Sequence, residues 1–384
     1  MKFIASTGIR SEYDILHPVI TELISNNHSV KIVVSGAHLS NSHHNTYDRI
    51  EKDGFEIADK IDSLLPTDRS VQRSKGVGLL IQALSQTVER EDPDFLLVVG
   101  DREESIATAI VGNYMQKLVV HIGGGDPVYG NADDPVRFAV SKLSHIHCCT
   151  ADAYAKNLLK IGEEEFRIFF TGNPSYVNIE KVENISINEI FQNLDIPKKN
   201  YIVLIKHPLS SEVSEAKKQM QVTLESLKIF CEKNNYQVLC IPPNSDPGSY
   251  EMRQVISSYS NEQWFIKLDT IPRLQFINIM RHSMALVGNS SMGILEAPYY
   301  GIPVVNIGKR QLGRLNAGNV EFVGYDSNEI VNAVERALLD EKYRTHVSLL
   351  KNPYGDSTAA RKIRQAIDTV DLNDNKWYKK QKLV

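Results

Sequence analysis

The chain has 384 residues, of which 42% are hydrophobic and 23% charged, and its formal net charge is -4. This length is enough for two domains with separate cores, and the slight acidic excess argues against nucleic-acid binding, which needs an excess of Lys and Arg. The apolar run from Phe3 to Ala5 is too short for a secretory signal, and no stretch approaches the roughly 18 apolar residues of a membrane span. We therefore expect a cytoplasmic protein with a small-molecule ligand and no nucleic-acid or membrane partner.

The cysteines do not form a metal-binding pattern. Cys148, Cys149, Cys231 and Cys240 show no CxxC spacing, and two adjacent residues on a strand point to opposite faces. The sequence therefore predicts reduced thiols, no zinc site and no metal.

Apolar runs alternate with segments of helical periodicity in the first half of the chain. The strands expected there span residues 2–7, 30–35, 95–99, 119–122, 146–149 and 167–170. The helices expected between them lie around residues 11–26, 70–92, 103–115, 135–144 and 152–160. Continuous apolar runs such as residues 95–99 are typical of buried parallel strands, so the pattern predicts a series of βα units.

The second half repeats this alternation. Its expected strands span residues 201–205, 237–241, 264–268, 285–287, 303–307 and 320–323. Its expected helices lie near residues 214–235, 249–260, 272–282, 291–300 and 327–339, and a C-terminal helix is expected at 358–370. Polar residues with Pro and Asn separate the halves, which predicts an N-terminal domain over 1–175 and a C-terminal domain over 176–360. Residues 361–384 are expected to pack back on the N-terminal domain, because the tail carries Trp377 and Tyr378 among charges.

This organisation predicts an α/β protein with two Rossmann-like domains facing a central cleft, the architecture of GT-B nucleotide-sugar enzymes. Ligands of such folds lie at the carboxyl ends of the parallel strands. The segment from Val287 to Glu296 combines a short strand, a Gly/Ser turn, and the start of a helix that contains Gly293. Because a helix N-terminus offers free backbone N–H groups to anions, this segment is predicted to bind a diphosphate.

Further polar residues follow the other expected strands. Arg10 begins a helix, where cations are disfavoured, so we interpret it as a ligand clamp. Asp101 either caps the next helix or takes part in catalysis, and the sequence leaves both readings open. The Gly123–Gly125 run allows a close approach of backbone to ligand and leads to Asp126 and then to Asp133 and Asp134, of which Asp134 also suits a helix N-cap.

Four histidines lie in or close to expected strands. A lone histidine is by default a hydrogen-bonded core residue, which is the reading for His145 and His147. Position directly after a strand raises the case for function at His207 and, less strongly, at His121.

Taken in order, these motifs resemble the hydrolysing UDP-N-acetylglucosamine 2-epimerases over roughly residues 1–365. The motifs are Thr7–Arg10, Gly100–Arg102, His121–Asp126 with the Asp133–Asp134 pair, Arg137–His145, Thr171–Tyr176, His207–Pro208, Gly288–Ser291 and Gly308–Arg314. The resemblance implies a reaction without metal or NAD, in which UDP leaves C1 while a proton leaves C2. Water then adds to the resulting glycal and releases the free 2-epimeric sugar, as in sialic acid synthesis. Relatives of this kind form homodimers or homotetramers.

The resemblance also implies roles for individual residues. Those implied to bind the nucleotide or substrate are Arg10, Arg102, His207, Asn244, Ser290, Ser291, Gly293, Glu296 and Arg310. Those implied to act in catalysis are Asp101, Asp126, Asp133, Asp134 and His207.

The chemistry requires such residue types independently. The C2 proton is not acidic, so its loss must be coupled to departure of a stabilised diphosphate, and inversion at C2 requires two groups on opposite faces of the sugar. Asp101 and Asp126 form the first candidate pair, with Asp133 next.

One position departs from many relatives of this type. They carry Glu where this chain has Gly123, and the acid of the loop is here Asp126. The first hypothesis is conversion of UDP-N-acetylglucosamine to free N-acetylmannosamine and UDP. The alternative is the same reaction on UDP-N,N'-diacetylbacillosamine, the substrate in legionaminic acid synthesis, and the sequence alone does not decide between the two sugars. A non-hydrolysing 2-epimerase, a GT-B glycosyltransferase and a non-catalytic sugar-nucleotide sensor are the other hypotheses.

Overall fold

The computed structural model describes residues 1–40, 46–65, 71–127, 133–243, 247–269 and 271–380, without the side chains of residues 133, 134 and 210. The chain divides into two compact units. The first unit comprises residues 1–178 together with 354–384, and the second comprises residues 179–353. The chain thus leaves the first unit once and returns to it for its last segment.

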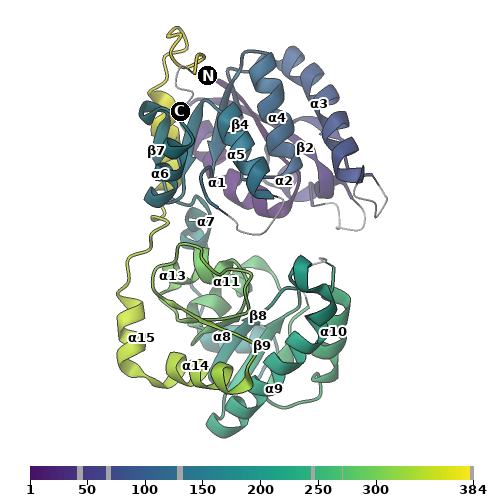
Figure 1. Ribbon diagram of the computed structural model, residues 1–384, viewed down its shortest axis with the longest axis vertical. Helices are drawn as coiled ribbons and strands as arrows, with labels where there is room; N and C mark the ends of the chain where they lie inside the picture. Colours follow the sequence, from purple (N-terminus) through teal and green to yellow (C-terminus); the bar gives the residue numbers. More distant parts are fainter. Residues whose placement is uncertain (41–45, 66–70, 128–132, 244–246, 270, 381–384) are drawn as a thin grey trace. The chain divides into compact units, whose positions relative to one another are not determined.

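The first unit is built on a seven-stranded parallel sheet with the order β3-β2-β1-β4-β5-β6-β7. Its strands are β1 (Lys2–Thr7), β2 (Ser29–Ser35), β3 (Glu56–Ile61), β4 (Phe95–Val99), β5 (Leu118–Ile122), β6 (Ile146–Cys149) and β7 (Ile168–Phe170). Its helices are α1 (Arg10–Ser25), η1 (Gly36–Leu39), α2 (Asp48–Lys52), α3 (Val71–Glu91), α4 (Glu103–Tyr114), α5 (Asp133–Leu143), α6 (Asp152–Lys160), η3 (Glu165–Arg167) and α16 (Ala359–Asp368), with α7 (Ser175–Lys181) at the boundary. Apolar residues of α1 and α16 bury one face of the sheet, and those of α3 and α4 bury the other (Figure 1).

The second unit contains a six-stranded parallel sheet with the order β10-β9-β8-β11-β12-β13. Its strands are β8 (Tyr201–Ile205), β9 (Gln237–Ile241), β10 (Phe265–Lys267), β11 (Leu286–Gly288), β12 (Val304–Ile307) and β13 (Val320–Val323). Its helices are α8 (Ile187–Asn193), η4 (Ser210–Glu215), α9 (Ala216–Asn234), α10 (Ser249–Ser258), α11 (Arg273–His282), α12 (Met292–Leu295), α13 (Ala297–Tyr300), α14 (Ser327–Leu339) and α15 (Glu341–Ser348). Residues of α9, α10 and α14 form the core on one face, and those of α8, α11 and α13 form it on the other.

Both sheets have the strand order of a Rossmann fold. Counted within each unit, the order is 3-2-1-4-5-6, and the first unit adds a seventh strand at the edge. The direction of winding reverses between β1 and β4 in the first sheet and between β8 and β11 in the second. Ligands of such sheets bind outside the carboxyl ends of the strands at this switch point. The predicted class, an α/β protein with two Rossmann-like domains, is confirmed.

Several elements differ from the sequence prediction. The short helices α2, α7, α8 and α15 were not predicted, and two further differences have a clear physical reason. The strand β3 was not predicted, because its sequence EIADKI has no continuous apolar run, and it pairs only with β2 at the sheet edge. The helix predicted at 291–300 is divided into α12 and α13, with Pro298 in the first turn of α13. Proline has no N–H to donate to the preceding turn, which explains why one continuous helix does not form.

The C-terminal segment packs on the first unit. In Figure 1, α16 lies beside α1, and Ile363 and Ile367 of α16 belong to the same buried cluster as Tyr13 and Leu16 of α1. Trp377 is 3% exposed and joins that cluster. The tail is therefore part of the core of the first unit.

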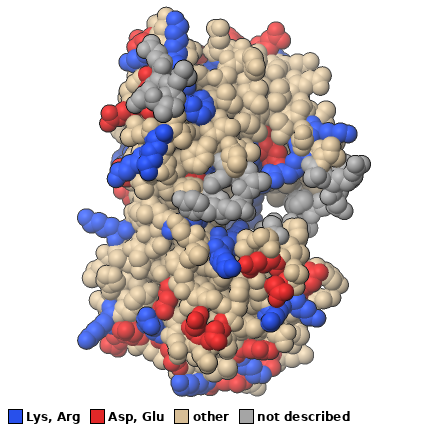
Figure 2. All heavy atoms as spheres, viewed as in Figure 1, with Lys and Arg blue, Asp and Glu red and all other residues tan. Residues whose placement is uncertain are grey.

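Charged residues of both signs are interspersed on the face of the molecule drawn in Figure 2. Over the described part of the chain, no helix combines the length and apolarity needed to cross a membrane. The described residues also contain no group of three or more His, Cys, Asp and Glu side chains arranged to hold a metal ion.

Candidate functional site

In the first unit, two of the predicted catalytic carboxylates contact the guanidinium group of one arginine, Arg137. Asp101 follows β4, Asp126 follows β5, and Arg137 lies on α5. Arg137 Nε donates to Asp101 Oδ2 at 3.0 Å, Nη2 contacts the same oxygen, and Nη1 lies 3.3 Å from Asp126 Oδ2. The side chains of Arg137, Asp101 and Asp126 are only 11%, 17% and 8% exposed. Asp101 does not act as a helix cap, because α4 begins after Arg102 and its N-cap makes no side-chain hydrogen bond.

A chain of hydrogen bonds holds α5 against the turn that precedes Asp101. His121 Nε2 lies 2.8 Å from the Gly100 carbonyl oxygen, and His121 Nδ1 lies 3.2 Å from Ser141 Oγ on α5. Burial lowers the pKa of His121 to about 3, so its ring is neutral and donates one hydrogen bond while accepting another. His121 is thus a hydrogen-bonded core residue that positions the carboxylates.

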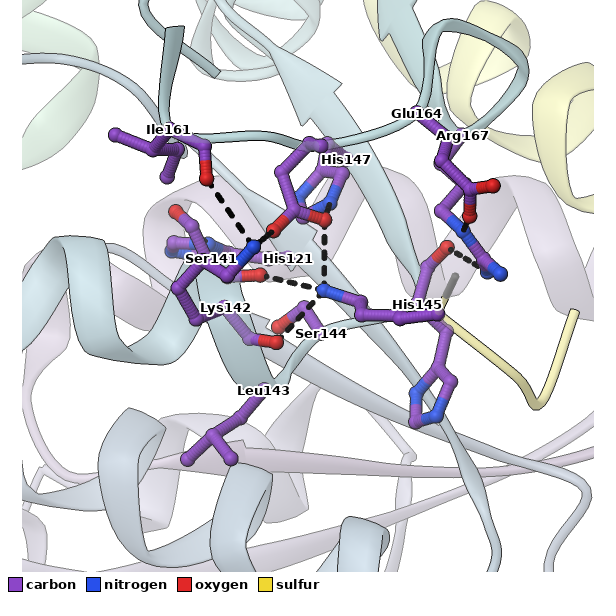
Figure 3. Close-up of polar contacts among 12 residues, drawn as sticks. His121, Ser141, Lys142, Leu143, Ser144, His145, His147, Ile161, Glu164 and Arg167 are labelled. Carbon is purple, nitrogen blue, oxygen red and sulfur yellow. Dashed lines mark hydrogen bonds and ion pairs between the residues drawn. The ribbon is translucent and has the colours of Figure 1, made fainter. Parts of the chain in front are cut away.

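The other end of α5 is held by a buried polar network, part of which is drawn in Figure 3. Lys380 Nζ donates to the carbonyl oxygens of Ser141 and Lys142 at 3.1 and 2.7 Å and to Glu163 Oε2 at 2.7 Å. His147 Nε2 lies 2.9 Å from the same carboxylate oxygen. Burial would raise the pKa of Glu163, but the hydrogen bond from His147 and the charge of Lys380 outweigh burial and lower it to about 2. An ionised Glu163 therefore anchors the tail, and the tail caps the C-terminus of α5.

A second set of carboxyl groups, which the sequence did not single out, lies at the switch point of the first sheet. Glu12 Oε2 accepts the Gly8 N–H at 2.8 Å, and Glu104 Oε2 lies 3.6 Å from Arg102 Nε. A Cβ on Gly8 would lie 1.9 Å from Glu104 Oε1, so a larger residue there would have to displace the Glu104 carboxyl group. Glu12 and Glu104 are 5% and 3% exposed.

The electrostatics of this set follow from burial. Burial, and after it the charge of Glu104, raises the pKa of Glu12 well above its usual value, and burial also raises the pKa of Glu104. Burial acts against the charge of Arg102, but the charges of Glu104 and Glu12 outweigh it and raise the pKa of Arg102. Much of the charge of Arg102 is thus matched inside the first unit.

Arg10, the other arginine predicted in this unit, is the first residue of α1. Its side chain is 58% exposed and lies 3.9 Å from Asp14. A cation at this end of a helix opposes the helix dipole, and the loose ion pair leaves the guanidinium accessible.

In the second unit two of the predicted nucleotide residues, His207 and Arg310, contact Asn289. Asn289 Nδ2 donates to the His207 carbonyl oxygen at 2.8 Å, and the His207 N–H donates to Asn289 Oδ1 at 2.7 Å. Arg310 Nη1 donates to the Asn289 carbonyl oxygen at 3.0 Å. This amide, which the sequence placed only within a motif, joins the ends of β8 and β11 at the switch point of the second sheet and positions Arg310 beside them.

The turn after β11 offers fewer free N–H groups than the sequence suggested. The Met292 N–H donates to Ser290 Oγ at 3.3 Å, and the N–H groups of Gly293 and Ile294 donate to the Ser290 and Ser291 carbonyl oxygens at 3.1 and 3.0 Å. The helix α12 has four residues, so its dipole is small. The expectation that N–H groups after Ser290 face the ligand is therefore wrong for these three.

The remaining predicted residues are placed as follows. A Cβ on Gly293 would lie 2.8 Å from Val304 Cγ1, so this glycine allows α12 to pack on β12. Glu296 links α12 and α13 and is half-buried. Asp133 and Asp134 are the first residues of α5, and their side chains are not described. Asn244 lies outside the described residues.

Comparisons with known proteins agree with this arrangement. A family model described as UDP-N-acetylglucosamine 2-epimerase matches residues 22–368. The chain is 32% identical over 97% of its length, and 97% of the relative, to the UDP-N,N'-diacetylbacillosamine 2-epimerase (hydrolyzing) of Legionella pneumophila. It is 30% identical, over 86% of its length and 85% of the relative, to the GDP/UDP-N,N'-diacetylbacillosamine 2-epimerase (hydrolyzing) of Campylobacter jejuni.

A similar fold is found in the crystal structure of the UDP-GlcNAc 2-epimerase from Neisseria meningitidis bound to UDP-GlcNAc. The TM-score is 0.82 at 21% identity, and the match covers 96% of this chain and 100% of that one. The GT-B-like fold class expected from the sequence is therefore confirmed.

Proposed function

Because the chain belongs to the UDP-N-acetylglucosamine 2-epimerase family, we propose that it is a hydrolysing 2-epimerase that converts a UDP-linked 2-acetamido sugar into the free 2-epimer and UDP. The observation that carries this proposal is the pair of carboxylates, Asp101 and Asp126, on the single guanidinium of Arg137. Such a pair supplies the two proton-transfer groups that inversion at C2 requires.

The first unit would carry out the chemistry at C2. One carboxylate removes the C2 proton as the C1–O bond to UDP breaks, which gives the glycal, and an acid then returns a proton to the opposite face as water adds at C1. Arg137 contacts both carboxylates and holds them near one another, while the side chains of Asp133 and Asp134 are proposed as further acid/base groups from the first turn of α5.

The second unit would bind the leaving group. The residues proposed to contact the nucleotide there are His207, Asn244, Ser290, Ser291, Gly293, Glu296 and Arg310, with Arg10 and Arg102 contributing from the first unit. Arg310 is the strongest of them on the evidence of geometry, because Asn289 holds it beside the carboxyl ends of β8 and β11. Charge stabilisation of the departing diphosphate is what makes loss of a non-acidic proton feasible.

The relatives favour UDP-N,N'-diacetylbacillosamine as the substrate. Two of them, at 32% and 30% identity, are named for that sugar and for the hydrolysing reaction. The loop acid of this chain is Asp126, and Gly123 stands where many relatives carry Glu. This difference agrees with membership of a separate substrate subgroup. UDP-N-acetylglucosamine is the second candidate, because the Neisseria meningitidis enzyme of similar fold is named for it.

Incubation with each UDP-sugar in D2O, followed by NMR, tests the proposal. The expected products are free sugar inverted at C2 and deuterated there, together with an equal amount of UDP. A product that still carries UDP would identify a non-hydrolysing epimerase, and turnover that requires an acceptor would identify a glycosyltransferase. The Asp101→Asn variant should bind UDP and release no sugar, and full activity in this variant would contradict the acid/base assignment.

A further inference from the structure

A lysine with no role in the proposed reaction lies buried at the switch point of the second sheet. Lys206 directly follows β8 and is 1% exposed. Its Nζ donates to the Ile307 carbonyl oxygen at 3.3 Å, at the end of β12, and lies 4.8 Å from the centre of the Tyr325 ring. The Tyr325 hydroxyl in turn packs against Gly308, where a Cβ would lie only 2.2 Å from the hydroxyl oxygen. The ammonium is thus enclosed directly beneath the strand ends that carry His207, Asn289 and Arg310.

The partners of this ammonium are a carbonyl and an aromatic ring, neither of which carries a full negative charge. An ammonium has three donors and is costly to bury without an anion. Burial lowers the pKa of Lys206 to about 7, and the charge of Glu212 on η4 acts weakly in the opposite direction. Glu212 is engaged elsewhere, since its Oε2 accepts from Gln219 Nε2 at 2.7 Å and its Oε1 lies 3.8 Å from Lys309 Nζ.

The other charged or titratable groups near Lys206 in the sequence or at neighbouring strand ends are His207, Lys309, Arg310 and Tyr325. His207 is the next residue, Arg310 and Lys309 follow β12, and Tyr325 follows β13. Burial raises the pKa of Tyr325 far above neutrality, so that residue remains neutral. Lys309 and Arg310 are basic, so neither supplies the anion that Lys206 lacks.

We propose that Lys206 is the proton-linked cation of the nucleotide site, and that binding of UDP brings one proton from solvent onto its amine. The inference rests on the proposed function, because it requires UDP to bind at the carboxyl edge of the second sheet. Cleavage of the C1–O bond leaves one further negative charge on the diphosphate. A cation that is fully formed only beside this charge stabilises the departing UDP more than the intact UDP-sugar.

Linkage gives the size of the effect. Where free Lys206 is neutral and UDP-bound Lys206 is protonated, UDP affinity falls up to tenfold for each unit that pH rises. The expected result is a dissociation constant for UDP that increases between about pH 7.5 and 9. The terminal phosphate of UDP is already ionised in this range, because its second pKa is about 6, and histidine with an ordinary pKa of about 6.5 is already neutral.

The test is isothermal titration calorimetry of the full chain with UDP at about pH 8, in buffers of different ionisation enthalpy. The wild type should take up between half a proton and one proton per UDP bound, and this measurement needs no variant. Lys206→Met, which keeps an unbranched side chain one atom shorter, should bind UDP with no uptake and with an affinity independent of pH. Lys309→Met, which removes the neighbouring exposed lysine, should retain the uptake of the wild type.

The outcomes separate this inference from the proposed function. UDP binding by the wild type without proton uptake would overturn the role of Lys206 and leave the epimerase proposal intact. Uptake that persists in Lys206→Met would place the proton on another group and equally overturn the assignment. Failure of the wild type to bind UDP at all would contradict the nucleotide site and the proposed function together.

Discussion

Replacement of Arg137 by methionine tests the carboxylate pair most directly. The change removes the guanidinium that lies 3.0 Å from Asp101 Oδ2 and 3.3 Å from Asp126 Oδ2, while the side chains of both acids stay largely buried at 17% and 8% exposure. Removing one partner of a buried ion pair costs about 3–5 kcal/mol of stability, because the remaining charge is left without compensation. Loss of acid/base positioning should also lower kcat by about 10²–10⁴-fold.

The assay pairs urea unfolding with UDP release from the UDP-sugar. As a matched control, Arg90→Met removes a 53% exposed arginine that lies 3.5 Å from Asp59 in the same unit, and it should change stability by less than about 1 kcal/mol. Adding Asp101→Asn to Arg137→Met should restore part of the stability, since it removes one uncompensated charge, but no activity. The reasoning is refuted if Arg137→Met keeps kcat within about threefold of the wild type while its stability falls as expected.

Three further changes test the buried ionisable groups. Glu163→Gln should cost about 3–5 kcal/mol at pH 7. Because the pKa of Glu163 is lowered to about 2, its contribution is complete above the unfolded value of about 4.3 and is lost as pH falls toward 2. The difference in the free energy of unfolding between variant and wild type, measured by urea melts, should therefore narrow between pH 4 and 2. A constant difference would contradict an ionised Glu163. Glu12 has a raised pKa, so the unfolded chain ionises first and the wild type loses stability as pH rises above about 4.3. Glu12→Gln should then raise the melting temperature more at pH 7 than at pH 4, and a drop at pH 7 would contradict this. The pKa of Lys206 is lowered to about 7 in the folded protein, whereas in the unfolded chain it is about 10.4. Between these values the unfolded chain holds one more proton, so the stability of the wild type relative to Lys206→Met should rise by up to about 1.4 kcal/mol per pH unit above pH 7. Parallel pH profiles for the two proteins in urea melts would show that this lysine does not titrate there.

The fold was predictable wherever burial left a local trace in the sequence. The strand β4 is FLLVV and is fully buried, so its run of apolar residues marks it directly. The edge strand β3 has a partner on one side only and a sequence of mixed polarity, and nothing local distinguishes it from a loop. Pairing with β2, which the sequence does not show, is what makes it a strand.

The candidate site was predictable by the same rule, and only in part. Asp101 and Asp126 could be found because they follow apolar strands, where α/β sheets place ligand-binding residues. Arg137 joins them across 36 positions of sequence, and no local pattern reports such a contact. Glu12 and Glu104 are acids in the first turns of α1 and α4, where the helix dipole already accounts for a carboxylate. Their burial depends on Gly8 and on tertiary packing, so no local sequence pattern predicts it.

The two units show why strand order alone does not assign a function. Both sheets reverse their winding between the first and fourth strands, yet the ionisable groups buried at these equivalent points are of different types. The first switch point encloses the carboxyl groups of Glu12 and Glu104, and the second encloses the amine of Lys206 beneath Arg310. Basic side chains such as Lys206 and Arg310 suit a diphosphate better than buried carboxyl groups do. Proton transfer at C2 needs carboxyl groups, and departure of UDP needs cations. The residue types at each switch point, and not the fold, therefore support the proposal that the acid/base chemistry belongs to the first unit and the leaving group to the second.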